Sequence, residues 1–399
     1  MATLDTPRDQ HAEQIRTPRM TVYKGGSRHG RGAMRKTVCF HVGLPKTGTT
    51  TIQQYLRKQD DKLRAVGFLY PGPREHQALG ADHNHPVMFN AMTGKAKVPS
   101  AGLDPEACRE VVAQAFEAFR RSDLAHLIWS FEAMALGVRN WDVRYLEQIL
   151  DGADVRIVFF ARYTDEWLES LVKQNVWIRA GPRGERIYGK PLRPLAPPRG
   201  ADEGGKVRPG RYTIAQGAKI SQALRTMRAI MPWAKIVLRS FDANCQAGRV
   251  VSGALAAMGV PVEAFPDADD EAGVRNPTKS DSYSMLLYHL EIAQAGWDVV
   301  RSVATAARKR DEAGLKFEPI NGRRFRVLSD ENVVEARGYY ESLREDYPKL
   351  PAQPPYVSNP AETFLPKSEG VALLDWLRPE ISDAIFDKAC AAYPATPGG

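Results

Sequence analysis

The chain has 399 residues, which is long enough for a complete α/β core with additional helices. Its formal net charge of +8 favours anionic ligands, and the lack of a basic motif with interleaved aromatic residues disfavours nucleic acid among them. The sequence contains neither a run of about eighteen apolar residues nor the apolar centre of a secretory signal, so we expect a soluble, cytoplasmic protein without an integral membrane segment. The four cysteines are too scattered to predict a zinc site or a disulfide framework.

The start of the chain differs in composition from the rest. Residues 1–35 contain few large apolar side chains, several Arg and Lys residues, and a glycine-rich basic stretch at 25–32. Such a segment cannot bury enough apolar surface to offset the entropy lost on ordering. We therefore predict a disordered basic tail over 1–35 and a single domain over 36–399.

The first predicted unit of this domain is a strand, a glycine-bearing turn and a helix. An apolar run at 37–40 leads into the segment HVGLPKTGTT at 41–50, and a helix-compatible stretch follows at 51–56. Free backbone N–H groups and the helix dipole point at one spot in such a turn, so we expect it to bind an anion.

The spacing of this turn departs from that of a Walker A loop, G-x-x-x-x-G-K-[ST], in which a lysine stands beside the hydroxyl that holds Mg²⁺. Gly43 and Gly48 keep the spacing, but Thr49 stands in the lysine position and the cation lies three residues earlier, at Lys46. The turn therefore suits a terminal phosphate-like group and lacks the usual arrangement for a Mg²⁺-bound triphosphate.

Strand-like and helix-like segments alternate along the rest of the domain. This predicts a three-layer α/β fold with a central parallel sheet, P-loop NTPase-like, with helical C-terminal additions. The stretch 74–99 is expected to be a loop, and the chain beyond residue 280 is expected to be mostly helical, most clearly at 285–290 and 336–343. After a short apolar run at 68–72, the predicted strands are 126–131, 155–162 and 235–239, and the predicted helices are 106–121, 142–150, 165–179, 216–231 and 249–258.

Two motifs resemble one family. The segment PKTGTT at 45–50, directly after a strand, resembles the 5′-phosphosulfate loop of sulfotransferases that use 3′-phosphoadenosine 5′-phosphosulfate (PAPS). The strand 155–162 ends in Arg162, and Ser170 follows eight residues later in the next predicted helix, as in family members where this pair grips the 3′-phosphate. The resemblance covers roughly residues 36–350 and implies transfer of a sulfuryl group from PAPS to an acceptor hydroxyl or amine, with 3′-phosphoadenosine 5′-phosphate (PAP) as product and no metal required.

The resemblance also implies roles for the residues of the turn. Lys46 would stabilise the bridging oxygen of the leaving phosphate, and backbone N–H groups at 47–50 would surround the 5′-phosphate. Thr51 stands where family members often have a Trp beside the adenine, so the adenine contact must be built differently. The cofactor-binding residues expected in this way are Lys46, Thr47, Gly48, Thr49, Thr50, Thr51, Arg162 and Ser170.

A later segment, 274–280, loosely resembles the Asn-x-Ser segment of bacterial sulfotransferases. Arg275 and Lys279 are therefore possible second contacts to the 3′-phosphate.

Three residues are candidates for the general base. Glu132 follows the strand 126–131, in the place where relatives carry a His or a Glu. The end of this strand, SFE at 130–132, resembles the S-x-E of bacterial members. The alternative is a structural acid paired with Arg162 or Lys46. His83 and His85 are the rivals, because they lie in a loop where acceptor contacts are expected and His titrates near physiological pH. Their alternative is a hydrogen-bonding role within the loop.

A basic Pro/Gly/Arg segment at about 181–211 is either a solvated insert or a cationic lid that recruits an anionic acceptor.

We expect the acceptor to be a carbohydrate hydroxyl on a glycan or glycolipid precursor, while phenols, small metabolites and tyrosine stay open. Two other classes of function also stay open. One is a P-loop kinase or nucleotide hydrolase, which Thr49 disfavours, and the other is a non-catalytic PAPS-binding module. Neither the acceptor nor the oligomeric state can be read from the sequence.

Overall fold

The computed structural model divides the chain into two units, Met1–Met34 and Arg35–Gly399. The structure describes residues 36–79, 85–96, 102–135, 137–180, 211–272, 281–293, 295–315, 317–320, 325–326, 328, 330–357 and 365–393, all in the second unit. The predicted basic tail and almost all of the predicted basic segment lie outside the described residues.

A five-stranded parallel sheet in the order β2-β3-β1-β4-β5 forms the centre of the fold. The register aligns His41 with Ser130 and Ala161 with Ser240, so the carboxyl ends of four strands meet at one edge. The strands are β1 (Thr37–Gly43), β2 (Phe68–Leu69), β3 (His126–Ser130), β4 (Asp154–Ala161) and β5 (Lys235–Ser240). The predicted α/β class and parallel sheet are confirmed.

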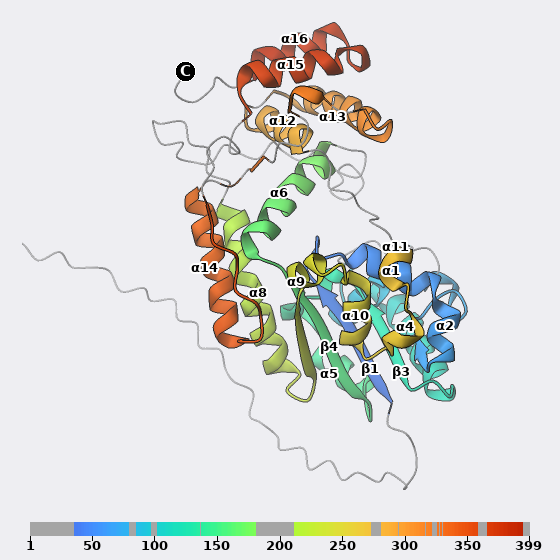
Figure 1. The fold of residues 1–399 in the computed structure, drawn as a ribbon. Coiled ribbons are helices and arrows are strands. Elements are labelled where there is room, and N and C mark those ends of the chain that lie inside the picture. Colours follow the sequence, from blue (N-terminus) through green and yellow to red (C-terminus); the bar gives the residue numbers. More distant parts are fainter. Residues whose placement is uncertain are drawn as a thin grey trace, which may run out of the picture. The chain divides into compact units, whose positions relative to one another are not determined.

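Helices cover both faces of this sheet, which makes three layers (Figure 1). Alternate residues of β1 point to opposite faces, because successive side chains of a strand alternate. Val38 and Phe40 pack into one apolar cluster and Cys39 into another. The first cluster includes residues of α3 (Pro86–Thr93), α4 (Pro105–Arg121), α5 (Val143–Ile149), α6 (Thr164–Ala180), α8 (Arg211–Ile230) and α14 (Asp330–Asp346). The second includes residues of α1 (Thr49–Lys58), α2 (Asp60–Ala65), α10 (Val250–Met258) and α11 (Ala268–Ala272).

Four of the C-terminal helices form an apolar cluster of their own, whereas α14 packs into the sheet core. The separate cluster is built by α12 (Asp281–Ile292), α13 (Trp297–Glu312), α15 (Lys367–Leu377) and α16 (Asp383–Ala392). Val172 of α6 joins this cluster, while Trp167 of the same helix packs into the sheet core. The helix α6 therefore contributes to both cores.

One prediction about this fold was wrong. The stretch 74–99 was expected to be a loop, but its described part contains a 3-10 turn at Gln77–Leu79 and the helix α3. All eight residues of α3 are buried. A helix that is buried on every side has no exposed polar stripe, so the 3.6-residue periodicity that reveals helices in a sequence is missing.

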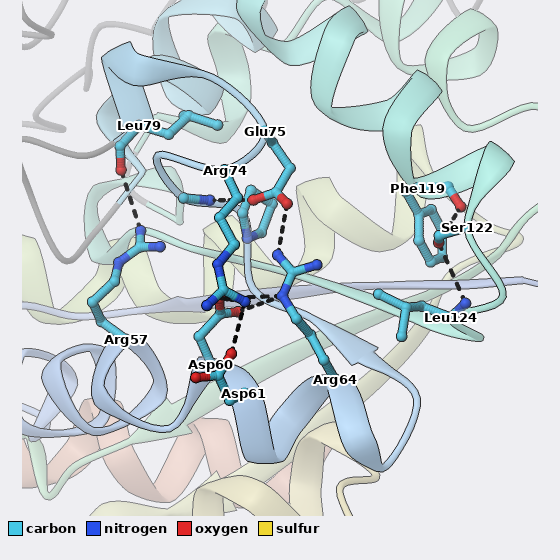
Figure 2. Close-up of polar contacts among 12 residues, drawn as sticks. Arg57, Asp60, Asp61, Arg64, Arg74, Glu75, Leu79, Phe119, Ser122 and Leu124 are labelled. Carbon is cyan, nitrogen blue, oxygen red and sulfur yellow. Dashed lines mark hydrogen bonds and ion pairs between the residues drawn. The ribbon is translucent and has the colours of Figure 1, made fainter.

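The segment that follows β2 is tied down by ion pairs and hydrogen bonds (Figure 2). The carboxylate of Glu75 accepts from Arg64 Nη2 at 2.6 Å and from the backbone N–H of Gly72 at 2.7 Å. Arg57 Nη2 donates to the carbonyl of Leu79 at 3.3 Å. The chain is thus held on α1 and α2 as far as Leu79.

Candidate active site

The turn between β1 and α1 has a left-handed backbone at two of its residues. Gly48 is the N-cap of α1 with φ of 72°, and Lys46, with φ of 69°, is the only non-glycine residue with positive φ in the described part of the chain. A Cβ at position 48 would lie 2.9 Å from Phe241 and 3.0 Å from Val250. Both the left-handed backbone and the close packing therefore require glycine at this position.

The first turn of α1 offers backbone N–H groups to a ligand. Its first turn has no acidic side chain, and no side chain caps the helix. Among the described residues, the N–H groups at 47–51 donate to no protein acceptor. Such groups, together with the helix dipole, favour a phosphate-like anion.

The threonines of the turn differ in what they can add. The buried Thr47 hydroxyl donates to the carbonyl of Leu44 at 2.7 Å, so Thr47 can offer a ligand only its N–H. Thr49 is also buried, whereas Thr50 and Thr51 are half-buried. The Thr50 hydroxyl is therefore the better donor of the predicted pair Thr49 and Thr50.

Arg162 brings the two sequence motifs together. It directly follows β4, and its Nη1 donates to the carbonyl of Lys46 at 3.0 Å. Trp167 of α6 donates to the neighbouring carbonyl of Pro45 at 2.9 Å. Two consecutive peptides of the turn are therefore fixed by residues more than a hundred positions away in the sequence.

Asp242 is a site residue that the sequence analysis missed. It lies on the short helix α9 (Phe241–Gln246), with Oδ1 3.6 Å from Nε of Arg162 and Oδ2 accepting the N–H of Tyr163 at 2.7 Å. Burial raises the pKa of Asp242 to about 6, partly offset by the Tyr163 amide and by Arg162. An acidic residue just after the strand 235–240, at the carboxyl edge of the sheet, was the signal available in the sequence.

Ser170 and Arg275 complete the predicted phosphate contacts. Ser170 is half-buried on α6, the helix that follows Arg162, which agrees with the predicted succession of strand, Arg and helix. Arg275 lies outside the described residues, as does His83.

Glu132 is the first residue of a 3-10 turn, Glu132–Met134, just beyond β3. Its carboxylate is half-buried and accepts a hydrogen bond from Gln53 Nε2 at 3.2 Å. This is its only hydrogen bond, and it forms no ion pair with Arg162 or Lys46 among the described residues. The structural alternative, an acid paired with one of these cations, is therefore not what the structure contains.

The surroundings of His85 argue against its predicted role as the base. It is fully buried, its Nδ1 accepts the N–H of Ser130 at 2.9 Å, and its Nε2 lies 3.0 Å from the carbonyl of Pro71. Burial, with a smaller contribution from Arg57, lowers its pKa to about 3. Because both ring nitrogens already bind the main chain, His85 cannot take a proton from an acceptor, and the alternative of a hydrogen-bonding role is the one observed.

Scans against protein-family models, curated proteins and solved structures found no match. No helix in the described ranges combines the length and the low charge needed to cross a membrane. In the same ranges, no group of three or more His, Cys, Asp or Glu residues is arranged to hold a metal ion.

Proposed function

We propose that this protein is a PAPS-dependent sulfotransferase with a P-loop-like nucleotide site. The observation that carries the proposal is the hydrogen bond of 3.0 Å between Arg162 Nη1 and the carbonyl of Lys46. This bond joins the turn, with its backbone N–H groups and Lys46, to a guanidinium that directly follows a strand. The two groups suit the two phosphates of one nucleotide.

The residues present fit the anionic ends of such a donor. The turn supplies the N–H groups at the start of α1 and the side chain of Lys46 for the 5′-phosphosulfate. Arg162 is only 19% exposed, and its planar fork with the Ser170 hydroxyl suits the 3′-phosphate. Thr49, in place of a Walker A lysine, makes a Mg²⁺-bound triphosphate the poorer fit.

The transfer itself follows from these positions. Glu132 accepts the proton of the acceptor hydroxyl or amine as that oxygen or nitrogen bonds to sulfur. The bond between sulfur and the bridging oxygen breaks, and its electron pair stays on the 5′-phosphate. Lys46 and the amides of the turn stabilise this charge, so positioning and electrostatics supply most of the catalysis.

The acceptor we propose is a carbohydrate hydroxyl on a glycan or glycolipid precursor, on the strength of the resemblance to bacterial-type members. The test is to incubate the protein with sulfur-labelled PAPS and one acceptor of each class, namely sugar, phenol, small amine and tyrosine peptide, without Mg²⁺. We expect label on the sugar, transferred about 10²–10³-fold more slowly in the matched Lys46→Ala reaction.

The other outcomes separate the alternatives. Mg²⁺-dependent hydrolysis of ATP in place of sulfuryl transfer would favour a kinase or nucleotide hydrolase. Tight PAPS binding with no transfer to any acceptor class would favour a binding module. Label on a phenol or a peptide would keep the reaction and change the substrate.

A further inference from the structure

A line of buried polar side chains leads from the sheet to Glu132. His41 on β1 and Ser130 on β3 are neighbours in the register, and His41 Nδ1 lies 2.7 Å from Ser130 Oγ. Gln53 on α1 donates through Nε2 to Ser130 Oγ at 3.1 Å and to Glu132 Oε2 at 3.2 Å. His41, Ser130 and Gln53 are each at most 1% exposed. Polar groups buried this deeply destabilise a fold unless they are hydrogen-bonded, as these three side chains are to one another.

The orientation of the Gln53 amide is fixed by its partners. A carboxylate oxygen can only accept, so the atom facing Glu132 must be the NH₂ group. Its two hydrogens serve Ser130 and Glu132, one each. The amide oxygen of Gln53 is buried and has no partner in the described part of the chain. The side chain is therefore arranged to donate toward Glu132, although its own oxygen is left without a hydrogen bond.

A neutral donor has a particular effect on a carboxylate. A Lys or Arg at this position would also hold a carboxylate, but its positive charge would make the carboxylate a weaker base. An amide holds one oxygen without adding a charge beside it. Because Gln53 binds only Oε2, the second oxygen of Glu132 has no hydrogen bond among the described residues and is available to a substrate proton.

We propose that Gln53 is a positioning residue: it holds the Glu132 carboxylate in the orientation that accepts the acceptor's proton. This inference rests on the proposed function, since it assigns Gln53 a part in that same proton transfer. Ser130 and His41 fix Gln53 in turn, so the orientation of the base is anchored in the two central strands of the sheet.

The test uses two variants of similar size. Gln53→Met removes the donor and keeps the volume, and we expect kcat to fall about 10-fold or more with the affinity for PAP unchanged. Gln53→Glu puts a second carboxylate beside Glu132, so the two share a proton and the acid limb of the kcat–pH profile should move up by about one unit or more. Gln54→Glu is the matched control, because it adds the same charge one residue further along α1, away from Glu132, and should leave the profile in place.

The outcomes are distinguishable. Failure of the unaltered protein to transfer label from PAPS to any acceptor class overturns the proposed function and the positioning role with it. Normal turnover of the unaltered protein, with kcat and pH profile unchanged in both Gln53 variants, overturns the positioning role alone. If either variant lowers PAP affinity as much as kcat, Gln53 acts on the nucleotide loop, and the proposal is wrong. If Gln53→Met folds poorly, the pH profile of Gln53→Glu decides: a shifted acid limb supports the positioning role, and an unchanged one overturns it.

Discussion

His85 and Glu132 are both polar residues beside the end of β3, yet their surroundings are opposite. His85 is fully buried, and both of its ring nitrogens contact main-chain atoms, one from Ser130 and one from Pro71. Glu132 is half-buried and, within the described ranges, has a single hydrogen bond, from Gln53. From the sequence, the histidine was a credible base because its pKa ordinarily lies near neutrality.

This difference leads to a hypothesis: unused hydrogen-bonding capacity identifies a general base better than residue type does. A side chain whose polar atoms are all bound to the main chain stabilises a loop, whereas one with a free oxygen can meet a substrate. The predictions below test this distinction, starting with the largest expected effect.

Changing the two residues separately tests the comparison most directly. Glu132→Gln keeps size and removes the proton-accepting ability, so we expect the transfer rate to fall about 10²–10⁴-fold with PAP binding and folding retained. His85→Ala leaves a buried N–H and a buried carbonyl without partners. It should lower the free energy of unfolding by about 1–3 kcal/mol, with little loss of kcat per folded molecule. Thermal melts and steady-state kinetics on both proteins measure these effects.

The opposite pattern would contradict the assignment of the base. An active Glu132→Gln variant together with a dead, well-folded histidine variant would assign proton transfer to the histidine segment. His83→Ala completes the set, because His83 lies outside the described residues and its role as an alternative base stays a prediction.

Lys46 extends the comparison to the turn between β1 and α1. Lys46→Ala removes a positive charge from the turn that begins α1, and we expect the transfer rate to fall about 10²–10³-fold. Folding should be little affected, because alanine and lysine resemble each other in tolerating the left-handed backbone at φ of 69°. Lys58→Ala is the control, since Lys58 lies at the other end of the same helix with its side chain 58% exposed. Near-normal turnover of the Lys46 variant would contradict the mechanism.

Arg162 should affect binding more than chemistry. Arg162→Ala removes a guanidinium suited to the 3′-phosphate, so PAP should bind more weakly by about 1.5–3 kcal/mol, while an analogue without the 3′-phosphate should lose much less. Calorimetry with both ligands measures the difference. Equal losses of affinity for both ligands would mean that Arg162 has a structural role, through its hydrogen bond to the Lys46 carbonyl.

The parts of this molecule that the sequence revealed are those specified by local patterns. The central strands are apolar along most of their length because both faces of a parallel sheet are covered, while Ser170 falls on the expected helix and Arg162 directly after the observed strand β4. Gln53 and Asp242 were not found, because their partners Glu132 and Arg162 are 79 and 80 positions away and only the folded sheet edge brings them together. The helix α3 escaped because burial on every side erases its pattern.

Asp242 gives the smallest expected effect and the one that depends on pH. Its pKa in the folded protein is raised to about 6, chiefly by burial, above its ordinary value of 3.8. Between these values the folded state holds more protons than the unfolded state, so this residue makes stability fall as pH rises from about 4 to 6. Asp242→Asn resembles the protonated form and should remove that dependence.

The expected gain is smaller than the pKa shift alone would give. A shift of about two units corresponds to about 3 kcal/mol. The asparagine oxygen, however, would accept the hydrogen bond from the Tyr163 N–H. The amide NH₂ group would then face the Arg162 guanidinium, and two donors facing each other lower the gain in stability. We therefore expect Asp242→Asn to be more stable by about 1–2 kcal/mol at pH 8 and equal to the unaltered protein near pH 4, as measured by denaturant unfolding at both pH values. A stability difference that does not change between pH 4 and pH 8 would mean that Asp242 is not protonated in this range, and that the ion pair with Arg162 keeps it charged.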